Sequence, residues 1–309
     1  MTANSAVMPA VHLAAVRKKF DQTVALDDLS FDVAPGEMFG VIGPDGAGKT
    51  TTLRLICGLM KPDAGTVQVF GQDPFRAHRA ATAAIGYVSQ RFSLYGDLSI
   101  DENIEFFARL HGVDDFAARR ARLLELTGLA AFHDRLADRL SGGMKQKLAL
   151  ACTLVHEPSM LVLDEPTTGV DPVSRREFWK LLAEFLSQGL TIVLATPYLD
   201  EAERCHRVVL MHEGRALALD TPANLQASLA GTVIEIVVSP ARQALEVVRA
   251  AAGADRAQLF GDRLHVRVDR PDAATPIVEK LRAAGLEPTH VRPIVPALED
   301  VFIERVQRS

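Results

Sequence analysis

The sequence predicts an α/β protein with a mainly parallel sheet, an inserted helical lobe and a second, smaller α+β domain. Two observations predict the first domain. Short apolar runs alternate with segments of helical periodicity, and one of these runs leads directly into a glycine-rich loop. The third observation concerns the end of the chain, where the order of elements changes to β-α-β-β-α-β. We expect residues 1–225 to form the first domain and residues 226–309 the second.

Apolar runs and helix signals give the elements of the first domain. Residues 38–42 form an apolar run before the glycine loop, and residues 50–58 predict a helix that ends before Pro62. Helical periodicity from Ile100 to about His156 marks the inserted helical lobe, which we expect over about residues 91–157. The expected strands cover residues 11–16, 28–33, 38–42, 85–89, 160–163, 191–195 and 207–211, and a further helix surrounds Phe178 and Trp179.

The second domain has the element order of a small ferredoxin-like fold. Its two middle strands flank Gly261-Asp262, a dipeptide that favours a hairpin turn. The expected strands cover residues 233–238, 257–260 and 264–268, with a last strand before Pro293, and the expected helices cover residues 242–252 and about 273–284. We find no catalytic constellation in the sequence of this domain.

Composition and charge argue against several classes of protein. A net charge of −5 over 309 residues gives no basic footprint for nucleic acid. Although 48% of the residues are hydrophobic, no apolar run reaches the roughly 18 residues of a transmembrane helix, so we expect no membrane span. Residues 1–10 lack the pattern of a secretory signal. Cys57, Cys152 and Cys205 match no zinc spacing and predict reduced, mostly buried thiols in a cytosolic protein.

The glycine loop carries the clearest chemical signal of the first domain. Strand, glycine loop and helix follow one another, as a phosphate-binding loop requires. Backbone N–H groups of such a loop surround the β- and γ-phosphates, and the helix points its positive N-terminus at them. Lys49 is expected to bridge the phosphate oxygens, and the Thr50 hydroxyl to bind Mg²⁺. The loop consists of Gly43, Pro44, Asp45, Gly46, Ala47, Gly48, Lys49, Thr50 and Thr51.

Two acidic residues, Asp164 and Glu165, end an apolar strand further along the chain. Such a pair is by itself more often a surface turn, but in a chain with a phosphate-binding loop it predicts a catalytic role. Asp164 is then expected to hold Mg²⁺ through water. Glu165 is expected to polarise the water that attacks the γ-phosphate.

A rare peptide, Leu140-Ser141-Gly142-Gly143-Met144, precedes this acidic strand. Its serine and glycines can open a helix whose N-terminus presents N–H groups and a hydroxyl to an anion. The loop, this signature peptide and the acidic pair together resemble the ATP-binding cassette (ABC) family over roughly residues 10–225. The resemblance implies a RecA-like parallel core, an antiparallel β subdomain and a helical subdomain. It also implies a head-to-tail dimer in which Ser141, Gly142 and Gly143 face the γ-phosphate held by the opposite subunit.

The resemblance implies roles for three more residues. Phe20 lies where the family places an aromatic ring on adenine, although an isolated Phe is more often a core residue. Gln90 lies where a glutamine contacts Mg²⁺ and the attacking water, and relays the nucleotide state to the transmembrane partner. Asp171 lies in the family's loop across the dimer seam, where it contacts the partner's site.

One position departs from the family. The strand after the acidic pair usually ends in a histidine, and here Pro197 takes that place, in a register fixed by the Tyr198-Leu-Asp-Glu-Ala-Glu203 run that follows. Proline has neither a side-chain donor nor a backbone N–H, so it cannot contact the γ-phosphate as histidine does. Thr196 and Tyr198 are the alternative donors, although strand-end neighbours point elsewhere. Loss of one preorganised donor typically costs about 2.7–4 kcal/mol, so we expect a site that binds ATP well and hydrolyses it slowly.

At subfamily level the chain resembles the ATPase subunits of drug- and antibiotic-exporting systems of the daunorubicin-resistance type. It is especially similar to the first cassette of two-cassette multidrug exporters, which also lacks the histidine. Two further runs carry this resemblance, Asp171-Pro-Val-Ser-Arg-Arg-Glu-Phe-Trp179 and Pro296-Ala-Leu-Glu-Asp-Val-Phe-Ile303.

This resemblance implies an ATPase, with ATP and Mg²⁺ as its ligands, bound peripherally to the cytoplasmic face of a membrane. Its implied partners are separate integral membrane permeases and a second, histidine-containing cassette, with no nucleic acid. We expect the segment after Gln90, with Phe92, Leu94 and Tyr95, to contact the permease. Two alternatives stay open, a soluble ABC protein and a regulator that binds ATP without driving a permease.

Overall fold

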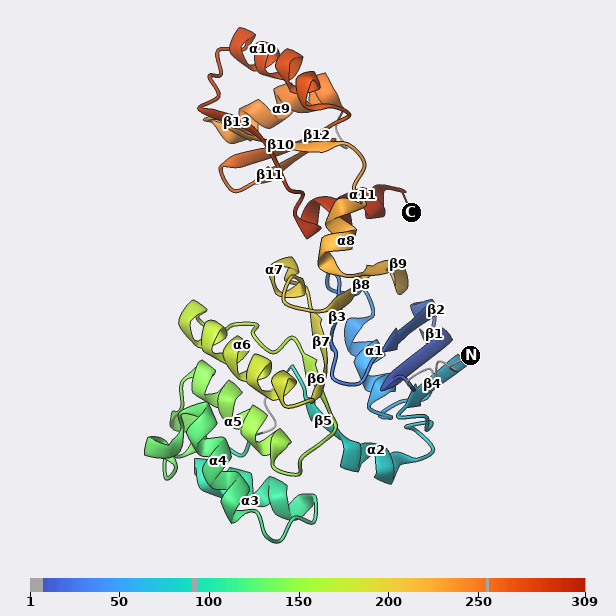
Figure 1. Ribbon diagram of the computed structural model, residues 1–309, viewed down its shortest axis with the longest axis vertical. Coiled ribbons are helices and arrows are strands. Elements are labelled where there is room, and N and C mark those ends of the chain that lie inside the picture. Colours follow the sequence, from blue (N-terminus) through green and yellow to red (C-terminus); the bar gives the residue numbers. More distant parts are fainter. Residues whose placement is uncertain (1–7, 91–93, 254–255, 309) are drawn as a thin grey trace, which may run out of the picture. The chain divides into compact units, whose positions relative to one another are not determined.

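A computed structural model describes residues 8–90, 94–253 and 256–308 (Figure 1). The chain divides into two compact units, Met1–Ala216 and Leu217–Ser309. The division falls upstream of residue 225, where the change of sequence pattern put it, and the strand β9 (Arg215–Asp220) contains it. Among the described residues, no helix combines the length and the apolar character that crossing a membrane requires.

A six-stranded sheet forms the core of the first unit, with the strand order β5-β6-β7-β3-β8-β9. Its central strands are buried throughout and pair in parallel, which is typical of strands covered on both faces. The expected strands over residues 38–42, 85–89, 160–163, 191–195 and 207–211 are confirmed to within one residue. They are β3 (Met38–Ile42), β5 (Ile85–Val88), β6 (Met160–Asp164), β7 (Thr191–Thr196) and β8 (Arg207–His212).

A second, antiparallel sheet has the order β2-β1-β4, with β1 (Val11–Phe20), β2 (Thr23–Val33) and β4 (Ala64–Val69). The first two strands are longer than the expected ranges 11–16 and 28–33, and β4 was not expected. Charged residues interrupt the apolar runs, but pairing continues to Phe20 and Thr23 because an antiparallel sheet can leave one face in water.

The helices of the first unit follow the expected order. The helix α1 (Lys49–Ile56) begins one residue before and ends two residues before the expected range 50–58. In Figure 1 the helices α3, α4 and α5 gather in a lobe beside the parallel sheet, as the helical periodicity predicts. The remaining helices and their bounds are α2 (His78–Ala84), α3 (Ile100–Leu110), α4 (Ala117–Thr127), α5 (Gly142–Leu154), α6 (Pro172–Ser187) and α7 (Leu199–Ala202), with short 3-10 turns at Ala130–Phe132 and Ala137–Arg139.

The second unit contains a four-stranded antiparallel sheet with the order β11-β12-β10-β13. This order, with two crossover helices, is the expected ferredoxin-like arrangement. Its elements are α8 (Pro222–Ala227), β10 (Thr232–Val237), α9 (Ala241–Ala252), β11 (Ala257–Phe260), β12 (Arg263–Val268), a 3-10 turn (Pro271–Ala274), α10 (Thr275–Ala283), β13 (His290–Ile294) and α11 (Leu298–Arg308).

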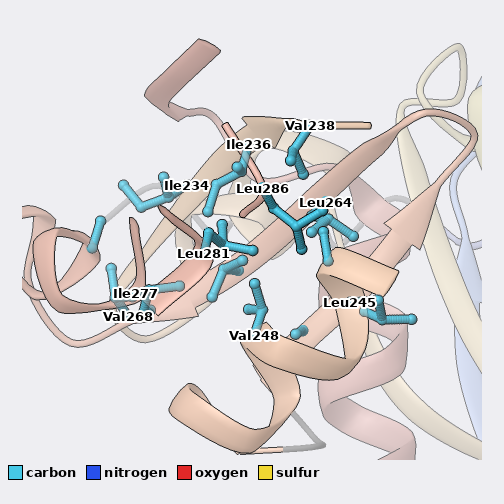
Figure 2. Close-up of a cluster of buried hydrophobic side chains, with 14 residues drawn as sticks. Ile234, Ile236, Val238, Leu245, Val248, Leu264, Val268, Ile277, Leu281 and Leu286 are labelled. Atoms are coloured by element: carbon cyan, nitrogen blue, oxygen red, sulfur yellow. The ribbon is translucent and has the colours of Figure 1, made fainter. Parts of the chain in front are cut away.

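The apolar core of the second unit lies between the sheet and the helices α9 and α10. Figure 2 shows Ile234, Ile236, Leu264 and Leu281 among its buried side chains. The expected end of the last strand before Pro293 is wrong, since β13 contains this proline. An edge strand tolerates proline because one side of it needs no ladder hydrogen bond, and β13 is an edge strand. The helices α8 and α11 were not expected.

Candidate functional site

Three neighbouring strands of the parallel sheet end at one edge and place the expected site residues there. The strand β3 leads into the glycine loop, β6 ends in Asp164, and β7 ends in Thr196. In open parallel sheets, ligands bind outside the carboxyl ends of the strands. A nucleotide site is therefore expected at this edge.

Two glycines of the loop are required by close backbone packing. A Cβ atom on Gly48 would lie 2.6 Å from the carbonyl oxygen of Ala25, and its φ of 98° favours glycine as well. A Cβ atom on Gly43 would overlap the carbonyl group of Met211. Gly48 is also the N-cap of α1, so Lys49 is the first residue of the helix that follows the loop.

The ammonium group of Lys49 lies between the glycine loop and the end of β6. Its Nζ donates to the carbonyl oxygen of Pro44 at 3.1 Å and lies 3.4 Å from Oε1 of Glu165. A third oxygen, Oδ1 of Asp45, is 3.9 Å away. The Lys49 side chain is only 4% exposed, so the chain holds a buried cation at the position where a phosphate-binding loop needs one.

Asp164 accepts hydrogen bonds on both carboxylate oxygens. Thr50 Oγ1 donates to Oδ1 at 3.0 Å, and the Tyr87 hydroxyl donates to Oδ2 at 3.3 Å. Burial raises the pKa of Asp164, against the effect of these two donors. The hydroxyl of Thr50 and the carboxylate of Asp164 form a set of hard oxygen donors, which fits Mg²⁺.

Glu165 has a left-handed backbone with φ 50°, which is uncommon for a residue other than glycine and typically costs about 1–3 kcal/mol. This conformation accompanies two contacts of its carboxylate. Nε2 of Gln90 donates to Oε2 at 3.0 Å, and Lys49 lies beside Oε1. The structure thus brings Lys49, Thr50, Gln90, Asp164 and Glu165 into one connected group.

The end of β7 offers no comparable group. The Thr196 hydroxyl is buried and accepts the backbone N–H of Tyr198 at 3.1 Å. The Tyr198 ring lies 5.2 Å from the guanidinium of Arg175. Among the described residues, no side-chain hydrogen bond joins either alternative donor beside Pro197 to Lys49.

The signature peptide and Asp171 begin two neighbouring helices. Ser141 is the N-cap of α5 and accepts the N–H of Met144 at 3.3 Å, while Asp171 caps α6 by accepting two backbone N–H groups at 3.0 Å. Hydrogen bonds from Ser174 hold the pKa of Asp171 below its ordinary value. A Cβ atom on Gly143 would overlap the Ser174 side chain, so the two helix starts pack closely. Across the described ranges, no hydrogen bond or ion pair joins the signature peptide to the glycine loop.

Phe20 and the expected docking residues lie outside this connected group. Phe20 ends β1 with 46% of its surface exposed, and its ring centre is 5.6 Å from the ammonium of Lys18. Tyr95 is exposed and packs edge-on against Phe106 of α3 at 4.6 Å. Phe92 lies outside the described residues.

Two residues near this site, Tyr87 and the buried carboxylate Glu201, were not among the site residues predicted from the sequence. Glu201 accepts from the Thr167 hydroxyl and, at 2.9 Å, from Nε of Arg175, so it ties the segment after Glu165 to the segment after β7. The available signal for Tyr87 was a hydroxyl within an otherwise apolar strand. For Glu201 it was an acidic residue at helix spacing between apolar neighbours, which is too common a pattern to single out.

The fold and this site define a nucleotide-binding protein with a phosphate-binding loop. The ABC transporter family profile matches residues 26–168, and the profile of the C-terminal domain of DrrA1-3-like ATP-binding proteins matches residues 221–306. The chain belongs to the DrrA-like family of ABC transporter ATP-binding proteins.

Relatives and solved structures agree with this assignment. The chain is 42% identical to Nod factor export ATP-binding protein I of Burkholderia pseudomallei (strain 1710b) over 95% of its own length and 96% of the relative. It is also 42% identical to the probable multidrug ABC transporter ATP-binding protein YbhF of Escherichia coli (strain K12), over 91% of its length but only 49% of YbhF, so it spans about half of that protein. The structure of cbiO1 from Clostridium perfringens, part of the transporter complex cbiONQ, superposes with a TM-score of 0.66 and 29% identity over 71% of this chain and 91% of cbiO1.

Proposed function

We propose that this protein is the ATPase subunit of an ABC exporter and that it binds MgATP at the edge formed by β3 and β6. One observation carries the proposal: the buried ammonium of Lys49 lies 3.4 Å from the carboxylate of Glu165, next to the pair of Thr50 and Asp164. Phosphoryl transfer to water requires three parts: a cation that binds phosphate, oxygen donors that bind a metal, and a carboxylate that orients the water.

Each of these residues has a defined task in hydrolysis. The N–H groups of the glycine loop and Lys49 hold the β- and γ-phosphates, and Phe20 supplies a ring for adenine. Thr50, Asp164 and Gln90 hold Mg²⁺, which neutralises charge on the phosphates when it is bound. Glu165 accepts a hydrogen bond from the attacking water and orients it.

The second half of the site comes from another cassette. Ser141, Gly142 and Gly143 present a helix N-terminus, but they have no hydrogen bond to this chain's own loop among the described residues. A head-to-tail dimer gives this N-terminus a γ-phosphate to bind, with Asp171 near the seam. In such a dimer each ATP lies between one subunit's loop and the other subunit's signature.

Export requires a membrane partner, because the chain offers no described helix that could span a bilayer. The names of its relatives associate them with multidrug and Nod factor transport, and cbiO1 is part of a transporter complex. We infer that this subunit docks on separate permeases at the cytoplasmic face of the membrane. Co-purification of a tagged chain with permease subunits from detergent-solubilised membranes tests this. A chain that stays free of membrane proteins would favour a soluble or regulatory ABC protein.

The docking surface of this proposal is the segment after Gln90, about Arg91 to Glu105, in which the exposed Tyr95 packs against Phe106, the residue that follows the segment. Gln90 links this segment to Glu165, so displacement of the segment on docking reaches the catalytic carboxylate. Tyr95→Asp is expected to uncouple transport while leaving ATP binding intact. Phe132→Asp is a control, because Phe132 is an exposed aromatic residue of the same lobe, at 36% exposure against 45% for Tyr95. Normal transport in Tyr95→Asp would move the docking surface elsewhere.

We further propose that this chain's own site hydrolyses ATP slowly because Pro197 ends β7. The Thr196 hydroxyl contacts the backbone of Tyr198, and the Tyr198 ring contacts Arg175, so neither side chain is joined to the group around Lys49 and Glu165. This chain keeps an intact signature peptide although its own site lacks the donor from β7. An intact signature is expected if it binds the γ-phosphate held by a partner cassette. The partner would be a second, histidine-containing cassette, so that the dimer contains one slow and one complete site.

A regulator that binds ATP without turnover is the second candidate, and Pro197 is the observation that favours it. The two candidates differ in the response to a partner cassette. An ATPase subunit gains turnover beyond additivity when the partner is added, whereas a regulator binds ATP with no such gain. Steady-state phosphate release by the chain alone, the partner alone and the mixture decides between them.

A further inference from the structure

The strand β5 supplies one hydrogen-bond donor to each of the two acidic residues at the end of β6. Gln90, just beyond the strand, donates to Glu165, and the Tyr87 hydroxyl donates to Oδ2 of Asp164 at 3.3 Å. Gln90 belongs to the proposed catalytic group. Tyr87 has no role in that proposal.

The register of the sheet explains how Tyr87 reaches Asp164. Tyr87 pairs with Val162 in the parallel ladder between β5 and β6, so the two side chains share one face of the sheet. Asp164 follows two residues after Val162 and lies on that same face, one step further along the strand. The phenol ring, which is long enough to cover this step, places its hydroxyl against the carboxylate.

The contacts of Asp164 leave a specific task for this hydroxyl. Thr50 already donates to Oδ1, and Thr50 is itself one of the residues expected at the metal. A donor on Oδ2 fixes the rotation of the carboxylate, so that Oδ1 stays turned toward Thr50. Partners of this kind orient metal-binding carboxylates, and their removal typically lowers metal affinity by about 10- to 100-fold.

We propose that Tyr87 is a positioning residue that orients Asp164 and thereby sets the affinity of the nucleotide site for its divalent cation. The inference rests on the proposed function, since it assigns Asp164 to the metal. Tyr87 then links β5 to Asp164, which is expected at the metal. Gln90 links the end of the same strand to Glu165, which is expected at the attacking water. A shift of the end of β5 would then change both acidic residues together.

The test is Mn²⁺ binding by the full chain in the presence of a non-hydrolysable ATP analogue, measured from the electron paramagnetic resonance signal of free Mn²⁺. Tyr87→Phe removes one oxygen atom and keeps the ring. We expect its Kd for Mn²⁺ to rise about tenfold. Binding of a fluorescent ATP analogue in EDTA should stay unchanged, because the phosphate loop is untouched.

The controls separate this inference from the proposed function. Tyr198→Phe removes the same hydroxyl from a ring that lies beside the guanidinium of Arg175, and it should leave the Mn²⁺ affinity unaltered. Thermal unfolding of both variants checks that each is folded, and Tyr87→Leu repeats the test without the aromatic ring. Equal Mn²⁺ affinity in the unsubstituted chain and in Tyr87→Phe, with nucleotide binding intact, would overturn the inference alone. Failure of the unsubstituted chain to bind the ATP analogue would overturn the proposed function and the inference with it.

Discussion

The strands β6 and β7 are parallel neighbours in one sheet, yet their ends differ sharply in chemistry. β6 ends in Asp164 and Glu165, which accept hydrogen bonds from Thr50, Tyr87 and Gln90. β7 ends in Thr196, whose hydroxyl accepts the backbone N–H of Tyr198, and Pro197 lies between these two residues. Two parallel neighbours of one sheet therefore differ, with a dense polar group at the end of β6 and no comparable group at the described end of β7.

This difference separates two tasks that one site normally combines. The groups proposed to hold phosphate and metal come from the glycine loop and β6, where Lys49, Thr50, Asp164 and Glu165 lie together. A donor to the charge that develops on the γ-phosphate would come from β7, and Pro197 cannot supply it. Binding and turnover should therefore respond differently to changes at the two strand ends.

The largest effect is expected from the signature, because it would serve the partner's complete site and not the site beside Pro197. Ser141→Arg places bulk and charge at the N-terminus of α5, where Ser141 now caps the helix. We expect it to abolish most ATP turnover of the complex with a histidine-containing cassette. Glu165→Gln should lower turnover much less, since it acts at the slow site. Phosphate release by the two variant complexes makes the comparison, and equal losses would break the asymmetry.

The second largest effect is expected on the rate of ATP hydrolysis at the site formed by this chain's own glycine loop. Without a donor from β7, the isolated chain should hydrolyse ATP about 10²–10³ times more slowly than a histidine-containing homodimer. Addition of the partner cassette should raise the rate well beyond the sum of the two proteins. Single-turnover hydrolysis at saturating ATP gives this number without a contribution from binding. Fast hydrolysis by the isolated chain would mean that the end of β7 is not needed for turnover. Pro197→His is a weaker test, because proline also fixes the local backbone.

A smaller effect is expected at the strand end that is complete. Lys49→Ala removes a buried charge that contacts Pro44 and Glu165 and that should bind phosphate. The loss of a charge-assisted contact typically costs about 1.5–3 kcal/mol, or roughly 10- to 150-fold in nucleotide affinity. Titration with a fluorescent ATP analogue measures it, and Lys180→Ala, at an exposed position of α6, is the control. Undiminished binding in Lys49→Ala would remove the basis of the proposed function.

The sequence predicted the parallel core because strands buried on both faces leave continuous apolar runs, and it predicted the ferredoxin-like unit from the order of its elements and the Gly261-Asp262 turn. The same reasoning missed the length of β1 and β2, where charged residues face water and only cross-strand pairing maintains the strand. The helix α11 was missed because a short amphipathic helix at the end of a chain has few local signals. Apolar patterning therefore predicts strands that are buried on both faces more reliably than strands that are buried on one face.

At the candidate site, the sequence named Lys49, Thr50, Asp164 and Glu165, because their motifs have fixed spacing. Tyr87 lies beside Asp164 only through the pairing of β5 with β6, and no local pattern encodes that register. The roles of Phe20, Asp171 and the signature peptide stay predictions, since they depend on a nucleotide and a partner subunit. Spacing in one chain can identify a motif, but it cannot identify the side chain that lies next to the motif in the fold.

The smallest expected effect is on the free energy of unfolding, and it comes from Asp164 at the end of β6. Burial raises the pKa of Asp164 above its ordinary value of 3.8, so ionisation of this carboxyl group disfavours the folded state. The native state then binds more protons than the unfolded chain as the pH rises above 3.8, and the free energy of unfolding falls through that window. Asp164→Asn keeps the shape of the side chain and removes the charge. At neutral pH it should stabilise the protein by about 0.5–2 kcal/mol, as is typical when a functional site is relieved of strain, and it should abolish Mn²⁺ binding.

Thermal unfolding of Asp164→Asn and of the unsubstituted chain from pH 7 down to pH 4 tests this expectation. The difference in Tm should shrink as the pH falls toward 3.8, because the raised pKa of Asp164 lets the folded, unsubstituted protein take up a proton before the unfolded chain does. Asp171→Asn is a control of opposite sign, because hydrogen bonds lower the pKa of Asp171 and its ionised form favours the folded state. A lower Tm for Asp164→Asn at neutral pH would mean that Thr50 and Tyr87 stabilise the carboxylate more than burial destabilises it. The end of β6 would then be a stabilising element of the fold as well as a candidate metal site.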